Sequence, residues 1–140
     1  MTTEIPDGFA PVFRSSPFLD AIGPLYQRGI GGAMALGFHV ARKHTNGRGT
    51  LHGGVIATLA DVALGYAIAT ASDPPGSLVT TSLTVDFVGS ATIDDWVQTS
   101  IDIQKIGGRL AFANAYFHVG DQRIARASGV FLVAGAATGR

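Results

Sequence analysis

The sequence has no cysteine among its 140 residues and is poor in charge, with ten basic and ten acidic residues. The absence of cysteine excludes disulfides, thiol catalysis and cysteine-ligated metals. The balanced charge argues against a nucleic-acid partner, because nucleic-acid-binding proteins normally carry a basic surplus. Charged residues make up 14% of the chain and apolar residues 46%. So little polar surface predicts an oligomer that buries part of its apolar exterior.

The sequence also has little that would place it in a membrane or in a metal-enzyme class. Residues 1–7 lack the basic start of a signal peptide. The longest apolar run, 55–71, is interrupted by Asp61 and is short for a membrane span. The four histidines form no H-E-x-x-H pair, and no G-x-S-x-G or phosphate-binding glycine motif is present. We therefore expect a single cytoplasmic domain over residues 1–140, with no membrane partner, metal or cofactor.

The second half of the sequence alternates between apolar and polar residues, which is typical of half-buried strands. The alternation predicts strands over residues 79–87, 97–103, 110–119 and 123–133. Short turns at Gly107-Gly108 and Gly120-Asp121 join the last three strands as hairpins.

The first half of the sequence is dominated by one long apolar segment. Residues 53–71 lack proline and are rich in Ala, Leu, Ile and Val, so their length predicts a helix. Apolar residues surround this helix on nearly every side, which is typical of a helix that is buried all round. The elements predicted before it are a short helix from Ser15-Ser16-Pro17 to Ile22, a strand over 33–41 and a loop over 43–50.

This order of elements predicts an α+β fold in which an antiparallel sheet packs on one long helix. The sheet has one apolar face to cover, and the helix supplies the cover. The far side of the helix is apolar as well. We expect a second copy of the chain to bury that side.

The long helix carries one carboxylate. His52 and Asp61 are the only residues with an imidazole or a charged side chain between Gly49 and Ser72. A carboxylate in an apolar helix loses hydration, so it needs either a compensating partner or a function. Taken alone, Asp61 fits equally well as an acceptor that pins a loop.

His52-Gly53-Gly54 stands where the loop enters the helix. Backbone N–H groups in a first turn lack intrahelical partners and suit a carbonyl oxygen that gains charge during acyl transfer. Taken alone, the two glycines are more typical of a plain helix cap. Gly53 and Asp61 are eight residues apart, which is ~12 Å along a helix. If both act on one carbonyl, they must come from two antiparallel helices in two subunits.

The run from Asn46 to Asp61, N-G-R-G-T-L-H-G-G-V-I-A-T-L-A-D, resembles the signature of the PaaI-like hotdog-fold thioesterases. Residues 79–87 resemble the family's next strand, and Gly107-Gly108-Arg109 resembles its hairpin. The resemblance covers residues 42–133, about two-thirds of the chain. It implies a hotdog fold, with the antiparallel sheet wrapped around the central helix. It also implies an acyl-CoA thioesterase that is a homodimer or a homotetramer.

The resemblance implies chemical roles for four of the site residues. Asp61 is expected to be the nucleophile, or the base that activates water, and Thr80 to hold the attacking water. The Gly53 amide, helped by Gly54, is expected to polarise the thioester carbonyl from the facing subunit.

Further residues are expected to position the substrate. His52 and Asn46 would orient the thioester and the neighbouring backbone. The phosphates of coenzyme A favour basic residues near the pocket mouth, and Arg109 is our first choice, ahead of Lys105 and Arg48. For any one of these three, a solvated surface charge is the commoner role.

The sequence departs from the family pattern at two places. Ser90 replaces the usual proline after Phe87, and the first 40 residues match no feature of the family. We expect this amino-terminal segment to help shape the acyl pocket. The sequence therefore does not distinguish aromatic, medium-chain and branched acyl groups as substrates. Two other functions also stay open: a hotdog hydratase or dehydratase acting on thioesters, and a non-enzymatic acyl-CoA-binding module. The residues around the signature argue against the first, and the presence of Asp61 argues against the second.

Overall fold

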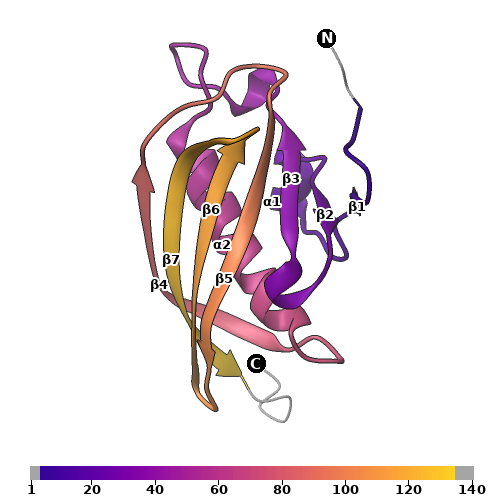
Figure 1. Cartoon of the computed structure of the whole chain (residues 1–140), viewed down its shortest axis with the longest axis vertical. Helices are drawn as coiled ribbons and strands as arrows, with labels where there is room; N and C mark the ends of the chain where they lie inside the picture. The colour runs from indigo at the N-terminus through magenta and orange to yellow at the C-terminus, as the bar shows by residue number, and fades with distance from the viewer. Residues whose placement is uncertain (1–3, 135–140) are drawn as a thin grey trace.

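All strands that the computed structural model contains over the described residues, 4–134, belong to one antiparallel sheet. Their order in the sheet is β1-β2-β3-β5-β6-β7-β4. The strands are β1 (Ala10–Pro11), β2 (Tyr26–Arg28), β3 (Ala35–His39), β4 (Ser77–Phe87), β5 (Trp96–Ile106), β6 (Leu110–Val119) and β7 (Gln122–Ala134). The helices are α1 (Pro17–Ile22) and α2 (Gly53–Thr70), with 3-10 turns η1 (Gly31–Ala33) and η2 (Arg42–His44). The predicted α+β architecture, a sheet around one long helix, is confirmed (Figure 1).

The four carboxy-terminal strands form where the alternation predicts them. The strand β6 has the predicted bounds, and the other three are one to three residues longer at one end or both. Two consecutive hairpins join β5, β6 and β7, and β4 returns to pair with β7 at the edge of the sheet. The segment before α2 differs more from prediction. The strand expected over 33–41 is present as β3, and two further strands precede it. The extra strands β1 and β2 span two and three residues, too few for any period to be visible.

The helix α2 runs from Gly53 to Thr70, close to the predicted span. Residues on its sheet-facing side are almost completely buried: Ile56, Leu59, Ala60, Ala63, Leu64 and Ala67. The opposite side is only half-buried within one chain, at Ala57, Val62 and Gly65 for example. The prediction of a helix buried all round is therefore wrong for the single chain. By length and composition α2 resembles a membrane span, but half of it is buried inside the structure, as in the core helix of a globular protein.

The edge strand β4 lies beside α2 and fixes one boundary of the uncovered helix side (Figure 1). Its outer edge has no neighbouring strand in the described chain. Both ends of the strand expose apolar side chains, at Val79 and Phe87. An unpaired edge of this length invites pairing with another strand. The half-exposed side of α2 and the open edge of β4 are therefore neighbouring surfaces.

The amino-terminal segment fixes the other boundary. Its helix α1 begins as predicted, with the Ser16 hydroxyl accepting a hydrogen bond from the Leu19 N–H at 3.2 Å. Before it, the Val12 N–H donates to the Leu25 carbonyl, and the Tyr66 hydroxyl of α2 donates to the Arg14 carbonyl at 2.7 Å. The segment is thus tied along the second half of α2.

Candidate active site

The first turn of α2 presents one free backbone donor. His52 is the N-cap residue, and its Nδ1 accepts a hydrogen bond from the Gly54 N–H at 2.8 Å. In the neutral ring the proton therefore sits on Nε2. Because the Gly54 N–H is engaged in this cap, it is not open to the carbonyl contact predicted for it. The Gly53 N–H has no hydrogen-bond partner among residues 4–134 and keeps the donor capacity of a first helical turn.

Asp61 and Thr80, both predicted from the sequence, meet in the structure. The Thr80 hydroxyl donates a hydrogen bond to Asp61 Oδ1 at 2.6 Å, from β4 to the open side of α2. The second carboxylate oxygen, Oδ2, has no partner in the described part of the chain. One oxygen of the carboxylate is thus oriented by the strand, while the other is free to receive a proton or to attack.

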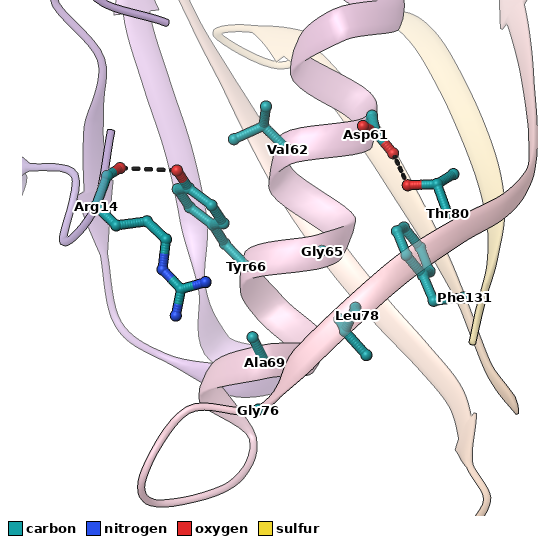
Figure 2. Close-up of a pocket in the computed structure, with 10 residues that line it drawn as sticks. All are labelled: Arg14, Asp61, Val62, Gly65, Tyr66, Ala69, Gly76, Leu78, Thr80 and Phe131. Atoms are coloured by element: carbon teal, nitrogen blue, oxygen red, sulfur yellow. Dashed lines mark hydrogen bonds between the residues drawn. The ribbon is translucent and has the colours of Figure 1, made fainter. Parts of the chain in front are cut away.

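The Asp61–Thr80 pair lines a pocket of about 200 Å³ over the open side of α2. Gly65 and Ala69 follow Asp61 along this side of the helix (Figure 2). Because Gly65 has no side chain and Ala69 has a single methyl group, they do not fill the pocket. The complete lining is Arg14, Asp61, Val62, Gly65, Tyr66, Ala69, Gly76, Leu78, Thr80 and Phe131. The pocket therefore combines one carboxylate with both polar and apolar walls, which suits a ligand with polar ends and an apolar body.

Arg14 and Tyr66 are pocket residues that the sequence did not single out. Tyr66 faces away from Thr80, and Figure 2 shows Arg14 beside it. Burial raises the pKa of the Tyr66 phenol, and the nearby Arg14 charge partly opposes this rise. The phenol therefore stays protonated at neutral pH and donates to the Arg14 carbonyl. The expectation that the amino-terminal segment helps to shape the pocket is consistent with this lining.

Asn46 and Arg109 lie outside this pocket, as do His52, Gly53 and Gly54. Asn46 uses its side chain within its own loop, where Oδ1 accepts from the Arg48 and Thr50 N–H groups and Nδ2 donates to the Thr50 hydroxyl. It holds the loop that leads into α2. Arg109 belongs to the β5–β6 hairpin and does not line the pocket. Its backbone carbonyl accepts from the Val133 N–H, and the structure gives its guanidinium no part in the Asp61 site.

The loop before α2 is anchored by a histidine that the sequence did not indicate. His44 is buried, with Nδ1 accepting from the Ala41 N–H and Nε2 donating to the Ile22 carbonyl. Its own carbonyl accepts the His52 N–H at 2.8 Å. This chain of hydrogen bonds fixes where the helix cap stands relative to the core.

Gly53 and Asp61 occupy the same helix eight residues apart, so the free amide and the carboxylate lie ~12 Å from one another. Within one chain they cannot contact the same carbonyl group. Among residues 4–134 no group of three or more His, Asp or Glu side chains is placed to hold a metal ion. The chemistry available from the described residues is therefore that of a carboxylate, a hydroxyl and a backbone donor.

Comparison with known proteins extends this picture. The model of a family described as the thioesterase superfamily matches residues 48–125, more than half of the chain. A Pseudomonas aeruginosa protein named "Putative esterase PA0474" is 45% identical over 128 residues, which cover 91% of this chain and 96% of that protein.

Solved structures agree with the family match. Zebrafish thioesterase superfamily member 2 has a TM-score of 0.77 at 26% identity, over 85% of this chain and 88% of its own. A mutant of the phenylacetic acid degradation protein PaaI from Thermus thermophilus has a TM-score of 0.76 at 23% identity, and the match covers 85% of this chain and 100% of that protein. A Streptococcus mutans protein whose structure was solved bound to acetyl CoA has a TM-score of 0.72 at 21% identity, and the match covers 78% of this chain and 87% of that protein. This chain therefore belongs to the thioesterase superfamily, whose members are acyl thioester hydrolases, and it has the hotdog fold.

Proposed function

We propose that the chain hydrolyses acyl-CoA thioesters, with an aryl or medium-chain acyl group, to the free acid and coenzyme A. The observation that carries this proposal is the Asp61 carboxylate, held by Thr80 at 2.6 Å and open at Oδ2, on the wall of a pocket that Val62, Leu78 and Phe131 also line. A pocket of about 200 Å³ suits an acyl group of a few carbons or one ring. The Streptococcus mutans structure bound to acetyl CoA supports coenzyme A as the thiol.

Asp61 is the reacting group of this mechanism. As a base, its Oδ2 takes a proton from water, and the water oxygen attacks the thioester carbon. The C–S bond of the tetrahedral intermediate then breaks, and the leaving thiolate recovers the proton as coenzyme A. As a nucleophile, Oδ2 attacks the same carbon and expels the thiolate, and water then hydrolyses the resulting anhydride. In both routes the Thr80 oxygen accepts a hydrogen bond from the water, because its own proton is given to Asp61.

The oxyanion formed in either route is stabilised by a backbone donor such as a free N–H of a first helical turn. The Gly53 N–H is free but lies ~12 Å from Asp61 along α2. A second copy lying antiparallel on the open side of α2, beside the edge of β4, would bring its Gly53 to this carboxylate. We therefore propose a homodimer with shared sites, alone or as half of a homotetramer, working in the cytoplasm. His52 would position the thioester through its Nε2–H.

Release of free thiol from a panel of aryl-, arylacetyl- and aliphatic acyl-CoA esters tests the proposal, with Asp61→Asn measured in parallel. Asparagine keeps the size of the side chain and can still bond to Thr80, but it neither takes a proton nor attacks. We expect at least one ester to be hydrolysed and the variant to lose about 10²–10⁴-fold in kcat. An unchanged melting temperature of the variant serves as the control for folding.

Near-normal hydrolysis by Asp61→Asn would end the proposed role of this carboxylate. If the wild-type protein hydrolysed no ester of the panel but bound acyl-CoA saturably in calorimetry, the hydrolase proposal would be given up for an acyl-CoA-binding module or a hydratase.

A further inference from the structure

We infer that Arg14 binds an anionic oxygen group at the far end of the acyl chain, so that thioesters of dicarboxylic acids are preferred substrates. This inference rests on the proposed function, because it assumes that the thioester carbonyl lies at Asp61. It concerns the end of the pocket that neither the signature nor the Asp61–Thr80 pair explains.

The first observation is the charge of the pocket. Arg14 and Asp61 are the two charged residues among the ten that line it. Arg14 forms no ion pair with any residue from 4 to 134, where the one salt bridge joins Arg126 to Asp86. The pocket therefore pairs a reactive carboxylate with a guanidinium whose charge no described carboxylate neutralises. Arg14 is exposed to solvent, and a substrate with a negative group at its far end would replace that water with a charge-assisted hydrogen bond.

The second observation is how Arg14 is held. Its guanidinium carbon lies 4.7 Å from the centre of the Phe13 ring and 6.0 Å from that of Tyr66. These rings are themselves in edge-to-face contact, with centroids 4.8 Å apart. The Tyr66 hydroxyl fixes the Arg14 backbone. An arginine held by ring faces and by its backbone keeps its N–H donors free for a planar carboxylate.

The third observation is position. Asp61 and Tyr66 are five residues apart on α2, a rise of ~7.5 Å, and Arg14 lies beside Tyr66 (Figure 2). An extended chain advances about 1.25 Å for each C–C bond of about 1.5 Å, so a six-carbon diacid places its far carboxylate oxygens about 7 Å from the thioester carbon, close to this rise. The phosphates of coenzyme A are separated from the thioester by the whole pantetheine arm. They are therefore poorly placed to meet an arginine that shares one small pocket with the reacting carbonyl.

The test compares two esters of equal length, hexanoyl-CoA and adipoyl-CoA, which differ in the terminal carboxylate. The quantity measured is the ratio of kcat/KM for adipoyl-CoA to that for hexanoyl-CoA. We expect Arg14→Met to lower this ratio about tenfold or more, mainly through KM, and Arg14→Lys to restore part of it. Arg28→Met is the matched control, because Arg28 also rests on an aromatic ring, that of Phe9, but lies outside the pocket. Its ratio should equal that of the wild-type protein.

Two results would overturn the inference. One is an unchanged ratio in Arg14→Met. The other is an equal loss for both CoA esters that disappears with the corresponding N-acetylcysteamine thioesters, because it would assign Arg14 to the phosphates of coenzyme A.

The inference is also testable if the wild-type protein hydrolyses neither ester and the proposed function fails. Calorimetric titration then compares the two esters directly. Tighter binding of adipoyl-CoA that is lost in Arg14→Met supports the inference, and equal affinities in the wild-type protein overturn it.

Discussion

The two sides of α2 are alike in sequence and different in structure. The sheet-facing side is closed, and its large residues Ile56, Leu59 and Leu64 are at most 2% exposed. The pocket-facing side carries Val62 and Gly65 around Asp61, and all three are partly exposed. Hydropathy alone does not distinguish the two sides, because both are apolar. The difference is that the chain's own sheet covers one side and leaves the other open.

This difference separates two uses of apolar surface. On the closed side, burial stabilises the fold by about 25 cal/mol for each Å² removed from water. On the open side, small residues leave room for a ligand or for a second helix, and the carboxylate stands where water and substrate can reach it. Substitutions on the closed side should therefore act on stability, and substitutions on the open side on catalysis and assembly.

The largest effect among the remaining tests is expected at Gly53, where the open side begins. Gly53→Pro removes the one free N–H of the first turn, and proline is well tolerated at this first helical position. His52 before it has ψ 133, the extended conformation that a residue preceding proline prefers. We expect a loss of about 10²–10³-fold in kcat, as for other single oxyanion donors. Thiol release by Gly53→Pro measures the loss in kcat, and a melting temperature equal to that of the wild-type protein shows that the variant is folded.

Gly53→Ala is the matched control for that prediction. It adds the same Cβ, which meets Phe87 ring carbons at 3.2 and 3.3 Å, but it keeps the N–H. Its activity should stay within a few-fold of wild type if the N–H is what matters. Equal losses in both variants would instead assign the effect to contact with Phe87.

Mixing two inactive variants tests whether the open sides of two copies share a site. A hybrid of Asp61→Asn and Gly53→Pro subunits contains one site with both lesions and one with neither. Refolding the two together should recover about a quarter of the wild-type activity, because half of the dimers are hybrids with one intact site. No recovery in a mixture that forms dimers would contradict the shared site.

The closed side and its sheet were predictable from the sequence because their signals are local. The period of two in residues 79–133 and the proline-free apolar run of α2 each lie within one element. Asp61 and Thr80 were predicted through the family resemblance, and their hydrogen bond joins residues 19 positions apart. The fold and this half of the site were therefore within reach of sequence reasoning.

The far end of the pocket was not predictable, because contacts between distant segments create it. Arg14 meets Tyr66 across 52 residues, and nothing around Arg14 in the sequence marks it as a pocket residue. Asn46 was expected to orient the thioester and the neighbouring backbone. Its side chain holds the backbone of the loop between residues 46 and 50, and a role at the thioester stays a prediction.

A pair of truncations on α2 sharpens the contrast between the two sides. Leu64 is fully buried and packs in the core, so Leu64→Ala should lower the free energy of unfolding by about 2–5 kcal/mol. Val62 is half-buried on the pocket side, and Val62→Ala should cost less than about 1 kcal/mol while changing KM. Urea unfolding and steady-state kinetics measure both quantities. Equal destabilisation by the two changes would mean that the open side is covered in solution.

The smallest effect is expected at Thr80. Thr80→Val keeps the shape of the side chain and removes the hydroxyl that donates to Asp61 Oδ1. Because the carboxylate and the free Oδ2 remain, we expect about a tenfold fall in kcat, the worth of one hydrogen bond to a charged group. Thr80→Ser keeps the hydroxyl and should recover most of the rate. If valine and serine behaved alike, the hydroxyl would have no part in orienting Asp61 or the attacking water, and the open side would act through its carboxylate and the partner's amide alone.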